Sequence, residues 1–166
     1  TVNAAGGGSS SGSLALSSGA VVNVTGGTQS LATGTSLTGA GVYGVAGGTL
    51  TINGAVSANN VDVASGTLDG AGNLTVNGVM NWSGGSQSTA GGTTTIASGA
   101  TLNITTASAK GLARTIANQG TVNVTGSGTI NTSGAGTVVN NQAGGQFNLS
   151  ADQTFSGDGG SNEIFV

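Results

Sequence analysis

The chain contains no cysteine, no proline and no histidine, and only 4% of its residues are charged. Disulfides are therefore excluded, and the lack of cysteine indicates no compartment by itself. Neither a Ser-His-Asp nor a Cys-His catalytic arrangement can be built without histidine. Collagen needs proline and a strict three-residue period, and disordered chains are normally rich in charge. These absences leave a folded protein that we do not expect to be an enzyme.

Charge and long apolar runs are also scarce. Two basic against five acidic residues give a net charge of −3, whereas a nucleic-acid partner needs a basic patch. No apolar run approaches the roughly 20 residues of a membrane-spanning helix. We therefore expect no nucleic-acid partner, no membrane insertion of this segment and no cofactor.

Glycine is abundant, at 34 of 166 residues, and a short alternating motif recurs between the glycines. Its clearest copy is Thr121-Val122-Asn123-Val124-Thr125-Gly126, in which apolar residues stand two apart, as in a strand with one buried face. The copies begin at positions 21, 49, 73, 101, 121 and 146. They therefore recur on average about every 25 residues, a period typical of stacked repeats.

The same strand motif recurs at the same place in each repeat, which favours stacked coils over a β-sandwich, the rival all-β fold. The sequence predicts a single domain over residues 1–166: an all-β, right-handed parallel β-helix of about 6–7 coils of roughly 25 residues. Residues 1–12 should form a first strand and a Gly/Ser turn. Residues 106–118, which hold Lys110 and Arg114, should form an irregular corner or a short helix.

The polar positions of the motif should form an outward column. Stacked Asn and Thr side chains can hydrogen-bond from coil to coil, which predicts a structural ladder; a flat threonine array could instead bind ice. The ladder residues are Asn23, Thr51, Thr75, Asn103, Asn123 and Asn148.

Several of these asparagines also lie in Asn-x-Ser/Thr triplets, the acceptor motif for glycosylation. The alternative is that the ladder pattern creates such triplets automatically. The candidates are Asn23, Asn73, Asn103, Asn123 and Asn148, and the same motif occurs at Asn81 and Asn131.

Other candidate sites are few. Asp152, Asp158 and Glu163, with Asn162 nearby, could offer oxygen ligands to Ca²⁺ or could form a solvated corner. Asp62 and Asp69 are the one acid pair that a single coil could bring together for glycoside hydrolysis.

Two further features should be structural. The dinucleotide-like glycine spacing of residues 39–44 lacks a following helix, which predicts a coil corner. Trp82 shares the phase of Met80 and is expected in the core, with sugar stacking as the alternative.

Segments such as Ile116-Ala117-Asn118-Gln119-Gly120-Thr121-Val122-Asn123-Val124 and residues 139–148 resemble repeats of large bacterial surface adhesins. These include autotransporter passengers and filamentous-haemagglutinin-like exoproteins. The resemblance implies a β-helical adhesive or stalk segment, outside the bacterial cell, that contacts a host-cell or abiotic surface, glycans or neighbouring copies of itself.

Alternatives are a carbohydrate-active or carbohydrate-binding β-helix, an ice-binding solenoid and a self-assembling filament subunit. Because the chain has no initiator methionine and ends within a strand-like Glu163-Ile164-Phe165-Val166, we expect it to be a segment of a longer protein.

Overall fold

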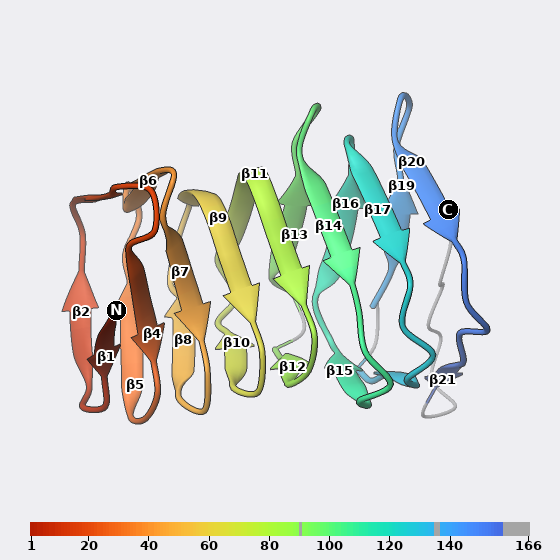
Figure 1. The fold of residues 1–166 in the computed structure, drawn as a ribbon, viewed down its shortest axis with the longest axis horizontal. Coiled ribbons are helices and arrows are strands. Elements are labelled where there is room, and N and C mark those ends of the chain that lie inside the picture. The colour runs from red at the N-terminus through yellow and green to blue at the C-terminus, as the bar shows by residue number, and fades with distance from the viewer. Residues whose placement is uncertain (90, 135–136, 158–166) are drawn as a thin grey trace.

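A computed structural model describes residues 1–89, 91–134 and 137–157. Within these ranges the regular structure consists of 21 β-strands, and every strand pairing is parallel. The strands stack in about seven turns that succeed one another along the long axis of the molecule (Figure 1). The predicted fold class, an all-β parallel solenoid, is confirmed. None of the described residues forms a helix long and apolar enough to span a membrane.

Each coil passes through three faces in the same order. Face 1 carries four of the six copies of the sequence motif, those that begin at positions 21, 101, 121 and 146. Its strands, in stacking order, are β1 (Val2–Ala4), β4 (Val21–Val24), β7 (Val42–Val45), the second half of β9 (Val56–Val63), the second half of β11 (Asn73–Trp82), β14 (Thr101–Ile104), β17 (Thr121–Val124) and β20 (Gln146–Leu149).

Face 2 forms a separate eight-stranded sheet. Its strands are β2 (Gly8–Ser10), β5 (Thr28–Leu31), β8 (Thr49–Ile52), β10 (Thr67–Asp69), β12 (Ser86–Gln87), β15 (Lys110–Leu112), β18 (Ile130–Thr132) and β21 (Phe155–Gly157).

Face 3 is continuous with face 1, because β9 and β11 run across the corner between them and join both into one 13-stranded sheet. Its strands are β3 (Ser13–Leu16), β6 (Ser36–Gly39), the first halves of β9 and β11, β13 (Thr93–Ile96), β16 (Thr115–Asn118) and β19 (Val139–Asn141).

The coils are shorter than the sequence period predicted, except for the last one. Along face 1, one inward column passes in register through Val2, Val22, Tyr43, Val61, Met80, Leu102, Val122 and Phe147. The motif copies at positions 49 and 73 belong to faces 2 and 3. Because all three faces use the same alternating pattern, the copies do not mark one position in the coil.

Inward side chains from the three faces meet in a narrow core that runs through the stack. Along face 1, for example, Val63, Trp82 and Ile104 occupy one inward column and are 0–3% exposed. Trp82 is therefore a core residue, as predicted. Alternation places every second residue inside, so a four-residue strand such as β8 contributes two buried side chains, and the shorter β10 contributes one.

Two local predictions are corrected. Residues 106–118 contain β15 and β16 and no helix, because Lys110, Leu112 and Ile116 alternate inward with the phase of a strand. Residues 1–12 contain a second strand, β2, where a turn was expected. Ser9 and Ser10 of this strand pair with Ser30 and Leu31, and backbone pairing tolerates their small side chains.

The prediction of a coil corner at residues 39–44 is partly correct: the chain turns at residues 40–41, and Val42, Tyr43 and Gly44 already belong to β7. Gly39 ends β6 with a φ of 87°, a backbone conformation that strongly favours glycine. A Cβ at Gly41 would lie 2.5 Å from the carbonyl oxygen of Ala20 in the preceding coil. The strand β7 follows directly, so no helix N-terminus is available to a pyrophosphate group.

Candidate functional site

An outward column on face 1, here called the asparagine column, consists mainly of asparagine side chains. Its members are one residue from each strand of that face and lie in direct register. They are Asn3, Asn23, Gly44, Asp62, Asn81, Asn103, Asn123 and Asn148.

Side-chain amides link the last four members of the asparagine column. Asn148 Nδ2 donates to Asn123 Oδ1 at 2.9 Å. Asn123 Nδ2 donates to Asn103 Oδ1 at 3.2 Å, and Asn103 Nδ2 donates to Asn81 Oδ1 at 3.0 Å. The two inner amides, Asn103 and Asn123, each use one N–H and one lone pair in the ladder, whereas Asn148 only donates and Asn81 only accepts. Every member therefore keeps N–H groups and lone pairs that can interact with other groups.

The expected ladder is thus partly correct. Asn23, Asn103, Asn123 and Asn148 share the column, but Thr51 lies on face 2 beside Ser30 and Asp69, and Thr75 lies on face 3. The error follows from the coil length, since the longer period inferred from the sequence assigns strands of three faces to one face. The threonines therefore do not form one flat array with the asparagines.

Asp62 interrupts the run of amides between Gly44 and Asn81. Its carboxyl group is half-buried, and this burial raises the pKa of Asp62 above its ordinary value. At Gly44, a Cβ would overlap the carboxamide of Asn23 as that side chain is placed here, so a larger residue at this position would require Asn23 to move.

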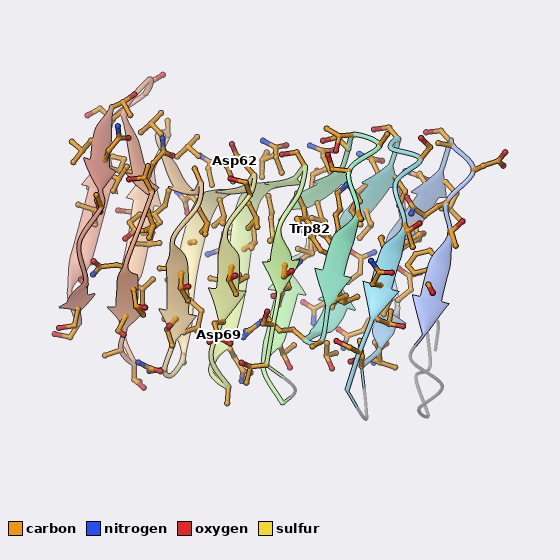
Figure 2. All side chains as sticks on the ribbon, turned by 90° about the horizontal axis from the view of Figure 1, so that it is seen from below. Asp62, Asp69 and Trp82 are labelled. Carbon is orange, nitrogen blue, oxygen red and sulfur yellow. The ribbon has the colours of Figure 1, made fainter. Side chains whose placement is uncertain are left out.

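Asp62 and Asp69 do not form a catalytic pair in this structure. Asp62 lies on face 1 and Asp69 at the end of β10 on face 2. Figure 2 shows the two residues at opposite edges of the molecule, with Trp82 placed between the faces. Asp69 Oδ1 instead accepts a hydrogen bond from the hydroxyl of Thr89 in the next coil.

The candidate glycosylation sites differ in how free their amides are. Asn103, Asn123 and Asn148 each donate Nδ2 to the ladder, so a glycan on any of them would compete with a ladder bond. Asn73 is exposed at the start of β11, and Asn23 is half-buried in β4. Glycosylation at these positions stays a prediction.

The proposed calcium ligands are only partly described. Asp152 is exposed in the connection between β20 and β21, whereas Asp158, Asn162 and Glu163 lie outside the described residues. In the described ranges no three His, Cys, Asp or Glu side chains come together in a way that could hold a metal ion.

Sequence reasoning missed the two buried bases. Arg114 is 0% exposed and Lys110 is 2% exposed, although basic side chains are normally among the most exposed. The signal was present as strand alternation in residues 110–118, but the helix-tolerant composition obscured it.

The guanidinium of Arg114 is held by oxygen atoms of two preceding coils. Nη2 donates to Gly72 O at 2.7 Å and to Thr93 O at 3.2 Å, and Nη1 donates to Gly70 O. Further contacts run from Nη1 to Asp69 O at 3.5 Å and from Nε to Thr94 Oγ1 at 3.4 Å. Arg114 thereby connects three coils at the corner between faces 2 and 3.

Burial lowers the pKa of Arg114 to about 10, and the charge of Asp69 partly opposes this shift. Burial likewise lowers the pKa of Lys110. Lys110 Nζ donates to Ser108 O at 2.8 Å and to Thr106 Oγ1 at 3.4 Å, so this base stabilises its own corner. We interpret both bases as structural, since every acceptor named here is part of a coil corner or its adjoining strand.

Comparison with known proteins gives no match to a family model, a curated protein or a solved structure.

Proposed function

We propose that this chain is a structural and adhesive rod segment of a large secreted bacterial surface protein, acting as an adhesin or its stalk. Its place is outside the cell. Its partners are a host-cell or abiotic surface, surface glycans, or neighbouring copies of the same protein.

The observation that carries the proposal is the unbroken parallel register of face 1 from β1 to β20. In such a stack, adding a coil lengthens the rod by one strand separation, about 4.8 Å, whatever the perimeter of that coil. The fold is therefore suited to holding groups at a distance from a point of attachment.

The outer surface supports contact spread over an area. Exposed positions of face 1 are mainly small, uncharged hydrogen-bonding side chains, and only 4% of the whole chain is charged. Donors and acceptors repeat at the strand spacing along the asparagine column. Many individually weak contacts with hydroxylated or amide surfaces can then add up through multivalency.

Adhesion is tested by measuring the retention of protein-coated beads on cell layers and on glass under flow. We expect retention of wild-type beads above uncoated beads, and a reduction for the double variant Asn103→Ala/Asn123→Ala on face 1. The matched control, Thr49→Ala/Thr67→Ala, changes the outward column of face 2 and should retain beads more strongly than the face 1 variant. Retention of wild-type beads no better than that of uncoated beads would remove the adhesive part of the proposal.

The location is tested by labelling intact source cells with an antibody to the folded chain. We expect labelling before permeabilisation. Labelling only after the cells are opened would contradict a surface role.

The alternative functions can be separated by simple measurements. A glycan array and a polysaccharide digestion panel test the carbohydrate-binding and carbohydrate-active alternatives. Thermal hysteresis tests ice binding, and concentration-dependent size-exclusion chromatography tests filament assembly.

A further inference from the structure

Two asparagines of the chain, Asn53 and Asn77, are followed directly by glycine. The backbone nitrogen of the next residue can attack an asparagine carboxamide, and glycine hinders this attack least because it has no Cβ. Asparagine is for this reason among the thermolabile residues. Both side chains are exposed, so the dipeptide and its exposure alone do not distinguish the two positions.

The backbone around Asn53 leaves the reacting peptide group free. Asn53 lies in the corner between β8 on face 2 and the start of β9 on face 3. Hydrogen bonds hold the chain on either side: Asn53 N donates to Leu31 O at 2.8 Å, and Gly34 N donates to Ala55 O at 2.9 Å. Between them, the C=O of Asn53 and the N–H of Gly54 bond to no described residue. Rotation of this peptide group therefore breaks no hydrogen bond within the described chain.

The backbone around Asn77 is constrained instead. Asn77 and Gly78 lie within β11, which continues across the corner between faces 3 and 1. Val76 and Val79, on either side of them, each pair with both neighbouring coils. Val79 N also donates to Asn60 Oδ1 at 3.2 Å. Rotation of the Asn77–Gly78 peptide group thus requires local opening of the sheet, which has a free-energy cost.

We propose that Asn53 is a site of spontaneous covalent modification by deamidation. Gly54 N bonds to Asn53 Cγ and gives up its proton, the bond from Cγ to Nδ2 breaks, and ammonia leaves. The product is a five-membered succinimide ring. Water then hydrolyses one of the two ring carbonyls, which leaves aspartate or isoaspartate at position 53. No oxidant, reductant or cofactor takes part.

Packing retains the glycine that makes Asn53 reactive. A Cβ at Gly54 would overlap the hydroxyl of Thr33 and lie 2.9 Å from the Cα atom of that residue in the preceding coil. Either product adds one negative charge to a chain whose net charge is −3, and isoaspartate also lengthens the backbone by one methylene group. The corner would therefore change in charge and length after folding, independently of any adhesive role.

The test follows both Asn-Gly pairs in the same folded protein, incubated in mildly alkaline buffer at body temperature. Peptide mapping by mass spectrometry measures the mass increase at each asparagine, and an isoaspartate-specific methyltransferase detects the rearranged product. We expect Asn53 to react at least about tenfold faster than Asn77, the ratio that an opening cost of about 1.4 kcal/mol around Asn77 would produce.

Urea-unfolded protein is the matched control, because neither dipeptide is then held by the fold. The ratio of the two rates in the folded protein is divided by their ratio in urea, which removes any effect of the flanking residues. In Asn53→Gln the reaction at position 53 should be lost, since a glutamine would have to form a less favourable six-membered ring, while Asn77 keeps its rate.

A corrected ratio near unity, or a faster reaction at Asn77, would overturn the inference. So would a folded protein in which Asn53 stays intact while the unfolded chain reacts. The mass readout does not depend on surface binding, so its failure is distinguishable from failure of the adhesion assay.

Discussion

Arg114 shows how a charge can be kept inside a thin core. Its hydrogen-bond partners in the described residues are four backbone carbonyls and one hydroxyl, contributed by two different coils. A planar guanidinium with five N–H donors suits such a ring of carbonyls, whereas an ammonium group does not.

We predict that Arg114→Met lowers the free energy of unfolding by about 3 kcal/mol, because the corner carbonyls lose their donors and the space is filled incompletely. Urea denaturation monitored by circular dichroism measures this. Lys110→Met is the matched control and should cost less, since Lys110 Nζ contacts two oxygen atoms of its own corner. An equal or smaller loss for Arg114→Met would show that the coil-to-coil contacts contribute little.

Asp62 leads to a prediction about pH. Its folded-state pKa is raised by burial above its ordinary value of 3.8, so the folded state binds more protons than the unfolded state between the two values. The contribution of this group to stability therefore falls as the pH rises through that window and stays unfavourable at neutral pH.

We expect Asp62→Asn to be more stable than the wild type at pH 7, by a small margin because solvent screens this half-buried group. We also expect it to gain less stability than the wild type as the pH is lowered. Urea midpoints measured from neutral pH into the acid range test this. The control Asp69→Asn should instead destabilise the protein, because Asp69 accepts from Thr89 and its charge opposes the effect of burial on Arg114. A variant Asp62→Asn that is less stable at every pH would contradict the prediction.

At the scale of the elements, a glycine in a corner leaves room for a large side chain from a neighbouring coil. A Cβ at Gly92 would lie 2.6 Å from both the Cζ atom of Arg114 and the carbonyl oxygen of Gly70. The glycine before β13 is therefore part of the space that the guanidinium occupies.

We predict that Gly92→Ala destabilises the protein by about 1–3 kcal/mol, since overpacking must displace the guanidinium or the corner. Gly12→Ala is the control: it lies between β2 and β3 with nothing within 4 Å of the added Cβ, and should change the urea midpoint little. Equal urea midpoints for the two variants would show that the corner accommodates the added methyl group without loss of stability.

The strands themselves were largely predictable, and their assignment to faces was not. Val122 and Val124 in β17, for example, have the alternation that buries them, and this is a property of the local sequence. Whether Thr51 lies above Asn23 depends on the corner lengths between them, which vary from coil to coil. The site of Arg114 was harder still, because Gly70, Gly72 and Thr93 come together only after the coils are stacked.

At the scale of the whole molecule, each coil interacts mainly with the coils next to it. Repeat proteins of this kind tolerate the removal of a complete unit better than removal of a fraction of one. The register defines one such unit as the segment that begins at Val21 and ends just before its partner Val42.

We therefore predict that deletion of residues 21–41 leaves a folded solenoid, because Val42 takes the place of Val21 beside β1. Deletion of residues 21–45, which follows the longer period inferred from the sequence, should disturb the fold because it removes two strands of face 1. Circular dichroism and urea denaturation compare the two deletions. Equal stability of the two would argue against the register described above.

The uneven corners have a consequence for how such a molecule can be varied. The shortest coil passes from face 3 to face 1 within the continuous strand β9, whereas residues 142–145 separate β19 from β20 in the longest. The perimeter of a coil and its height are thus independent. The perimeter changes from coil to coil, whereas strand pairing fixes the height. A peptide inserted at a corner would become a side branch at a defined level of the rod, so that variants could differ in what they display without differing in how far they reach.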